Sequence, residues 1–135
     1  MRELKFRGKP LDYDPMTMPE WMTGFYHQEL YGGRILHLIT DGATTFEVDP
    51  DTIGQYTGLC DKNGKEIYEG DILSANGRVV GWVKGGVRGY CYDVVYVNHP
   101  AGEKRWTLYA TVMDDYKGKI EITGNIHDNP GLLNT

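Results

Sequence analysis

The stretch from Gln55 to Ile72 constrains the fold most, because a tight turn separates two short strand patterns within it. The turn is the tetrad Asp61-Lys62-Asn63-Gly64. Asp at the first position can bond the backbone two residues on, and Asn and Gly tolerate positive φ. An Asn-Gly pair between such flanks is a strong hairpin signal. We therefore predict a hairpin with strands at 55–60 and 65–68, then a bend at Gly70.

The same pattern of strand, tight turn and strand recurs along the chain, which contains 18 Gly and 10 Tyr residues. Two further hairpins are predicted around Gly32-Gly33 and Asn76-Gly77. No stretch of ten or more residues shows sustained helical periodicity. Other predicted strands lie at 2–7, 44–48, 90–97, 106–112 and 119–126. The segments 49–52 and 129–133 are each predicted to form a turn or a single helical turn. The pattern indicates an all-β or β-dominated fold: a small bent barrel, SH3-like or similar, built from antiparallel hairpins. It would carry an N-terminal β extension and at most short helical turns.

Alternation along two of these strands predicts which side chains are covered. Leu4 and Phe6 share one face of the first strand, which should be half-buried. Residues 35–39 are apolar on both faces, which predicts a well-covered strand. The segment 8–20 holds three prolines and cannot sustain a regular ladder, so we expect an extended surface excursion there.

A chain of 135 residues is expected to form one domain, 1–135, with possible lobes at 1–52 and 53–135. The net charge of −5 argues against general binding of duplex DNA, which relies on basic residues. The start of the chain has no apolar signal core, and no window is long enough to span a membrane. We therefore expect a cytoplasmic protein without membrane contact. Cys60 and Cys91 lack metal-binding spacing and are expected to be reduced, buried thiols, with a disulfide between neighbouring strands as the alternative.

No residue pattern indicates a catalytic site, a metal or a cofactor. Gly64 comes fourth in its loop and no acid follows at the fifth position, which does not fit an EF-hand. The four histidines lack ligand spacing, and Ser74, the only serine, has no nucleophile motif. We therefore assign no catalytic or metal-binding residue and no cofactor.

Two groups of apolar residues are candidates for a contact surface. Met16, Met18, Trp21 and Met22 form either a small core that pins the proline-rich segment or an adhesive surface for a partner or subunit. The tyrosines of strand 90–97 serve either packing or, together with Trp82 and Trp106, stacking on single-stranded nucleic acid. The weak contact candidates are therefore Trp21, Met22, Tyr90, Tyr92 and Tyr96.

Three segments carry a resemblance to a known family: 1–7, 55–72, and 124–130 followed by Leu132-Leu133. In this order they resemble the YopX family of phage and prophage proteins. Cys60 stands where Lys is more usual. The resemblance implies a β-rich fold and a phage or prophage gene. It implies no known catalytic activity, cofactor or functional residue.

Two hypotheses about function remain. The first is a non-enzymatic, phage-encoded β module that binds itself as a homo-oligomer, another protein or nucleic acid. The second is a small hydrolase or nuclease that uses acidic residues. Its candidate residues are Asp61, Glu66, Glu69, Asp71 and His127, which would have to gather around one point.

Overall fold

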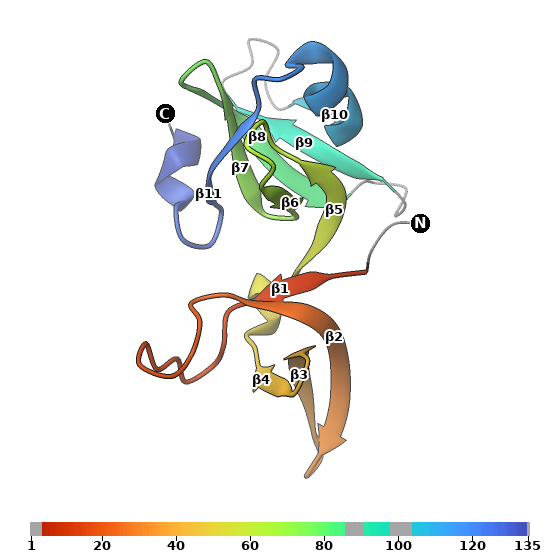
Figure 1. Ribbon diagram of the computed structural model, residues 1–135, viewed down its shortest axis with the longest axis vertical. Coiled ribbons are helices and arrows are strands. Elements are labelled where there is room, and N and C mark those ends of the chain that lie inside the picture. The colour runs from red at the N-terminus through yellow and green to blue at the C-terminus, as the bar shows by residue number, and fades with distance from the viewer. Residues whose placement is uncertain (1–3, 86–90, 98–103, 135) are drawn as a thin grey trace. The chain divides into compact units, whose positions relative to one another are not determined.

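The structure is a computed structural model that describes residues 4–85, 91–97 and 104–134 (Figure 1). The chain forms two compact units, Met1–Tyr56 and Thr57–Thr135, called unit 1 and unit 2 below. Strands dominate both units, which confirms the predicted β-dominated fold. The single domain with two lobes stays a prediction. None of the helices in the described parts of the chain is long and apolar enough to span a bilayer.

Unit 1 is an antiparallel sheet with the strand order β4-β3-β2-β1-β5. A short 3-10 turn, η1, precedes its last strand. Asp49 caps this turn by accepting a hydrogen bond from the Asp51 N–H, as the helical turn predicted at 49–52 requires. The bounds are β1 Phe6–Gly8, β2 Met22–Tyr31, β3 Arg34–Asp41, β4 Thr44–Glu47, η1 Pro50–Thr52 and β5 Gly54–Cys60, which continues into unit 2.

The β2–β3 hairpin turns at Gly32 and Gly33, with φ of +57° and +78°. Positive φ at both central residues is the geometry that matches the twist of antiparallel strands. The core of unit 1 lies at the other end of this hairpin and contains Met22, Ile39 and Val48. The prediction of a turn at Gly32-Gly33 is therefore confirmed.

Two predictions of burial in unit 1 are wrong. Ile35 of β3 is 55% exposed, and Leu4 before β1 is 65% exposed. Burial in β3 begins only at Leu38, because β4 pairs with β3 from Leu38 to Asp41. Apolar residues on both faces of a strand show that it can be covered. They do not show that the chain supplies a segment to cover it.

Unit 2 contains a curled antiparallel sheet with the strand order β10-β9-β8-β7-β11. Its core includes Ile67, Leu73, Val83, Val94 and Ile120, all 1% exposed or less. The hairpins predicted around 61–64 and 76–77 are confirmed. The bounds are β6 Glu66–Tyr68, β7 Asp71–Ala75, β8 Arg78–Gly85, β9 Tyr92–Tyr96, β10 Lys104–Thr107, α1 Leu108–Ala110, η2 Thr111–Asp115, β11 Glu121–Asn125 and η3 Pro130–Asn134.

The strand predicted at 106–112 is confirmed at Trp106 and Thr107 and wrong from Leu108 on, because the chain becomes helical after Thr107. The Thr107 hydroxyl accepts a hydrogen bond from the Ala110 N–H at 3.2 Å and so caps the turn. Leu108 and Thr111, three residues apart, are 1% and 0% exposed. Helical spacing therefore accounts for the burial of these two side chains.

Both cysteines are free thiols, but the prediction that both are buried is wrong for Cys60. Cys60 is exposed because it ends β5 directly before the exposed turn that leads to β6. Cys91 is half-buried just before β9.

Candidate functional site

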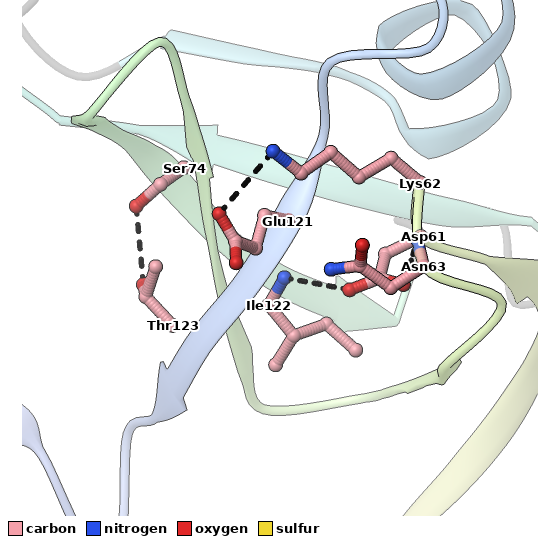
Figure 2. A network of polar contacts seen from close by, with 7 residues as sticks. All are labelled: Asp61, Lys62, Asn63, Ser74, Glu121, Ile122 and Thr123. Atoms are coloured by element: carbon pink, nitrogen blue, oxygen red, sulfur yellow. Dashed lines mark hydrogen bonds and ion pairs between the residues drawn. The ribbon is translucent and has the colours of Figure 1, made fainter.

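Asp61 joins the central turn of unit 2 to β11 (Figure 2). Its side chain is buried, and Oδ1 accepts hydrogen bonds from the Asn63 N–H at 2.9 Å and the Lys65 N–H at 3.0 Å. Oδ2 accepts the Ile122 N–H at 3.0 Å, across 61 residues of sequence. The carboxylate therefore closes its own turn and fastens that turn to a distant strand.

Burial by itself raises the pKa of Asp61, because it disfavours the charged form. The hydrogen bonds from Ile122, Lys65 and Asn63 act in the opposite direction, and together with the positive charge of Lys65 they outweigh burial. The pKa of Asp61 therefore lies below its ordinary value of 3.8. The group is an ionised structural anchor at neutral pH.

A second junction lies at the bend before β7. Gly70 has φ of +92°, and its carbonyl accepts the Ile126 N–H at 2.8 Å. Asp71 is 1% exposed and accepts the Tyr68 N–H at 2.7 Å, while its backbone pairs with Asn125 of β11. The bend predicted at Gly70 is therefore confirmed.

The loop after β11 is ordered by Asn125. Its side-chain oxygen accepts the His127 N–H at 3.0 Å and the Asp128 N–H at 2.9 Å. The Asn125 N–H in turn donates to Oδ1 of Asn129 at 3.2 Å. The segments 61–72 and 120–129 are thus held together by backbone pairing and by side chains that bond backbone groups.

These bonds bear on the hydrolase or nuclease hypothesis. The carboxylates of Asp61 and Asp71 bind backbone N–H groups in two separate junctions. Glu66 accepts a hydrogen bond from the Tyr68 hydroxyl at 3.3 Å. Within residues 4–85, 91–97 and 104–134, no three His, Cys, Asp or Glu side chains are placed to hold a metal ion.

The methionine and tryptophan candidates lie in different surroundings. Met22 is 4% exposed and belongs to the core of unit 1, so its side chain does not present a contact surface. Trp21 is half-buried, with the Arg7 guanidinium 4.7 Å and the Lys9 ammonium 5.5 Å from its ring centre. Met16, by contrast, is 89% exposed.

The tyrosine candidates of β9 pack inward. Tyr92 and Tyr96 lie against the core of unit 2, on the same face as Val94. The Tyr96 hydroxyl forms a hydrogen bond of 2.9 Å with the Thr111 hydroxyl, and burial raises the pKa of Tyr96 above its ordinary value. These contacts support the packing role of Tyr92 and Tyr96. Tyr90 lies outside the described residues.

A group of exposed apolar side chains in unit 1 was not among the predicted candidates. It lies on the β2–β3 hairpin (Figure 1), where Phe25, Leu30, Tyr31 and Ile35 are 55–76% exposed. Leu30 and Ile35 lie opposite each other on one face, and Phe25 and Tyr31 lie on the other face of β2. We call these four side chains the hairpin surface. A sequence signal for it exists, since both strands carry apolar residues on both faces beside a Gly-Gly turn. The same signal was interpreted above as a buried strand, because another segment of the chain was expected to pack against both of its faces.

Unit 2 has an exposed apolar surface of its own. Trp106, Tyr109 and Met113 are 50%, 63% and 41% exposed, on β10 and the helical segment that follows it. Tyr109 and Met113 are four residues apart and so lie on one side of this segment. We call this group the helical surface.

Fold and junctions together define a small β protein of two units, in which the conspicuous polar side chains hold the backbone together. The YopX protein family model matches residues 5–134, and the chain belongs to this family. The chain is also similar to protein EF1440 from Enterococcus faecalis, known from a crystal structure, at 21% identity. That similarity covers 98% of this chain and 99% of the other, with a TM-score of 0.41. No curated protein matches the sequence.

Proposed function

We propose that this protein is a phage- or prophage-encoded, non-enzymatic β module of the bacterial cytoplasm, and that it acts by binding protein through the hairpin surface. The observation that carries the proposal is the exposure of Phe25, Leu30, Tyr31 and Ile35 on one hairpin. The resemblance of segments 1–7, 55–72 and 124–130 to phage and prophage proteins supports the origin.

The chemistry of the hairpin surface favours a protein partner over nucleic acid. Tyrosine and phenylalanine are enriched in the buried centres of protein interfaces. The far end of the hairpin carries one basic residue, Arg34, which already pairs with Glu47 at 3.2 Å. A surface that binds phosphates would need several unpaired basic side chains.

Site-specific photo-crosslinking in the bacterial host tests this proposal. Benzoylphenylalanine replaces Phe25 or Tyr31 on the hairpin surface, which are 61% and 74% exposed. Tyr109 of the helical surface is the matched control at 63% exposure. We expect protein adducts at Phe25 and Tyr31 and none at Tyr109. Adducts at Tyr109 alone, or at none of the three positions, would refute the hairpin surface as the binding site.

A further inference from the structure

Within the part of the chain that the structure describes, one edge of β2 has no partner strand over most of its length. β1 pairs with β2 only at Met22, Thr23 and Gly24. Among the residues that the structure describes, no strand pairs with 25–31 along that edge. A long edge of this kind presents backbone N–H and C=O groups that can template another strand.

The hairpin turn determines which backbone groups face this edge. Tyr31 and Arg34 flank a two-residue turn, so they form the hydrogen-bonded pair that closes the hairpin. Hydrogen-bonding direction alternates along a strand, so the odd-numbered residues of β2 bond to β3. The N–H and C=O groups of Tyr26, Gln28 and Leu30 therefore point away from β3.

We infer that a second copy of this chain occupies the edge, with the two β2 strands antiparallel and Gln28 on the two-fold axis. This inference rests on the proposed function and names the partner. In this register Tyr26 faces the partner's Leu30 and Gln28 faces the partner's Gln28. Each of these positions exchanges two backbone hydrogen bonds, and the sheets of the two unit 1 copies join through their β2 strands.

The side chains on the other face match in the same register. Phe25 faces the partner's Tyr31, and His27 faces the partner's Glu29. Aromatic pairs and hydrogen-bonding polar pairs directly across two strands stabilise a sheet, and an imidazole can donate a hydrogen bond to a carboxylate. The His27 ring enters this pair with Nδ1 buried and without a hydrogen-bond partner, while its Nε2 lies 3.7 Å from the Glu29 carboxylate of the same strand.

The neighbouring symmetric registers lack this match. Centring the pair on His27 places His27 against the partner's His27 and Phe25 against the partner's Glu29. Centring it on Glu29 places two carboxylates directly opposite each other, which destabilises a sheet. Among these three registers complementarity therefore favours the one centred on Gln28, and a self-complementary match favours a second copy over an unrelated strand.

The inference is tested with two charge variants of the full chain, His27→Glu and Glu29→Lys. In a dimer of His27→Glu, the introduced glutamate of each copy faces the partner's Glu29. In a dimer of Glu29→Lys, the introduced lysine of each copy faces the partner's His27. Neither pair combines opposite charges. Each variant should therefore dimerise about tenfold more weakly than the unaltered chain.

Mixing the two variants restores the charge match. The glutamate introduced at position 27 of one variant then faces the lysine introduced at position 29 of the other, and the unaltered Glu29 faces the unaltered His27. We expect light scattering to show that the mixture regains the dimer, and circular dichroism to show that each variant keeps its fold.

Three outcomes would overturn the inference: an unaltered chain that stays monomeric at high concentration, single variants that dimerise as well as it does, or folded variants whose mixture stays monomeric. The photo-crosslinking result separates this failure from failure of the proposed function. Adducts at Phe25 and Tyr31 whose mass is not twice that of the chain would keep the binding role and refute the second copy. Absence of adducts at both positions would refute the binding role itself.

Discussion

At the scale of single residues, the acidic side chains of unit 2 act as backbone anchors. Asp61 receives three backbone N–H groups from two segments that are 61 residues apart, and Asp71 receives one at the bend before β7. A carboxylate that satisfies several buried N–H groups stabilises the backbone conformation around it. The residues that suggest metal or acid-base chemistry in the sequence therefore have a structural explanation.

Replacement of Asp61 tests this anchoring role. Asp61→Ala leaves three backbone N–H groups without their acceptor, and we expect it to lower the free energy of unfolding by about 3 kcal/mol. Urea denaturation measures the change. The control is Glu121→Gln, which alters only the exposed Lys62–Glu121 pair at 3.6 Å and should cost under about 0.5 kcal/mol. Equal losses for the two variants would contradict the anchoring role.

The same anchor makes stability depend on pH. The pKa of Asp61 is lower in the folded chain than its ordinary value of 3.8, so the folded state binds this proton less tightly than the unfolded state. Its contribution is complete above pH 3.8 and declines as the pH falls through the folded pKa. Asp61→Asn should remove this part of the acid sensitivity, which urea denaturation at a series of pH values measures. An unchanged acid profile would show that other groups dominate.

Part of this junction could be predicted from the sequence. The turn at 61–64 follows from residue types within four positions, so it could be predicted and is confirmed. The bond from Asp61 to Ile122 depends on where β11 lies in the sheet. Local residue types carry no information about a partner 61 residues away.

At the scale of elements, close packing of β8 against β9 depends on Gly81. A Cβ atom at this position would lie 2.3 Å from the Val95 carbonyl oxygen, which is backbone and cannot move aside cheaply. We expect Gly81→Ala to cost about 2 kcal/mol, because the two strands must separate or shift. Gly131→Ala is the control, since nothing lies within 4 Å of its Cβ position. Thermal unfolding compares the two, and similar midpoints would contradict this account.

Two elements show why prediction from local pattern succeeds or fails. The hairpins at 61–64 and 76–77 carry Asn-Gly turns. The turn at 76–77 has positive φ at both Asn76 and Gly77, a conformation that few residue types adopt readily. Residues 106–112 fit strand alternation and helical spacing equally well. The Thr107 cap and the core of unit 2 favour the helix there, and the core is a property of the folded chain.

At the scale of the whole molecule, the segments that identify the family and the exposed apolar surface have different roles. The central and C-terminal segments that carry the family resemblance meet in the junction at the bend before β7, where Gly70 bonds Ile126 and Asp71 pairs with Asn125. The hairpin surface lies in unit 1, outside those segments. The residues that identify the family thus account for backbone conformation in unit 2. They do not include the residues of the proposed binding surface.

The exposed surface could not be predicted from the sequence for a physical reason. Phe25, Leu30 and Ile35 have the apolar character of buried strand residues, and alternation cannot distinguish burial within a chain from burial against a second chain. Only the strand order shows that β1 covers the β2 edge no further than Gly24. Exposed apolar residues beside an unpaired edge are the combination that points to assembly.

Assembly through β2 is tested most directly by a disulfide on the proposed two-fold axis. With Cys60 and Cys91 replaced by Ser, Gln28→Cys should form a covalent dimer under mild oxidation, because paired Cα atoms there lie about 5.5 Å apart. Glu29→Cys is the control, since it faces the partner's His27 and should stay monomeric. Non-reducing electrophoresis would contradict the account if Gln28→Cys stayed monomeric or if Glu29→Cys formed the dimer instead.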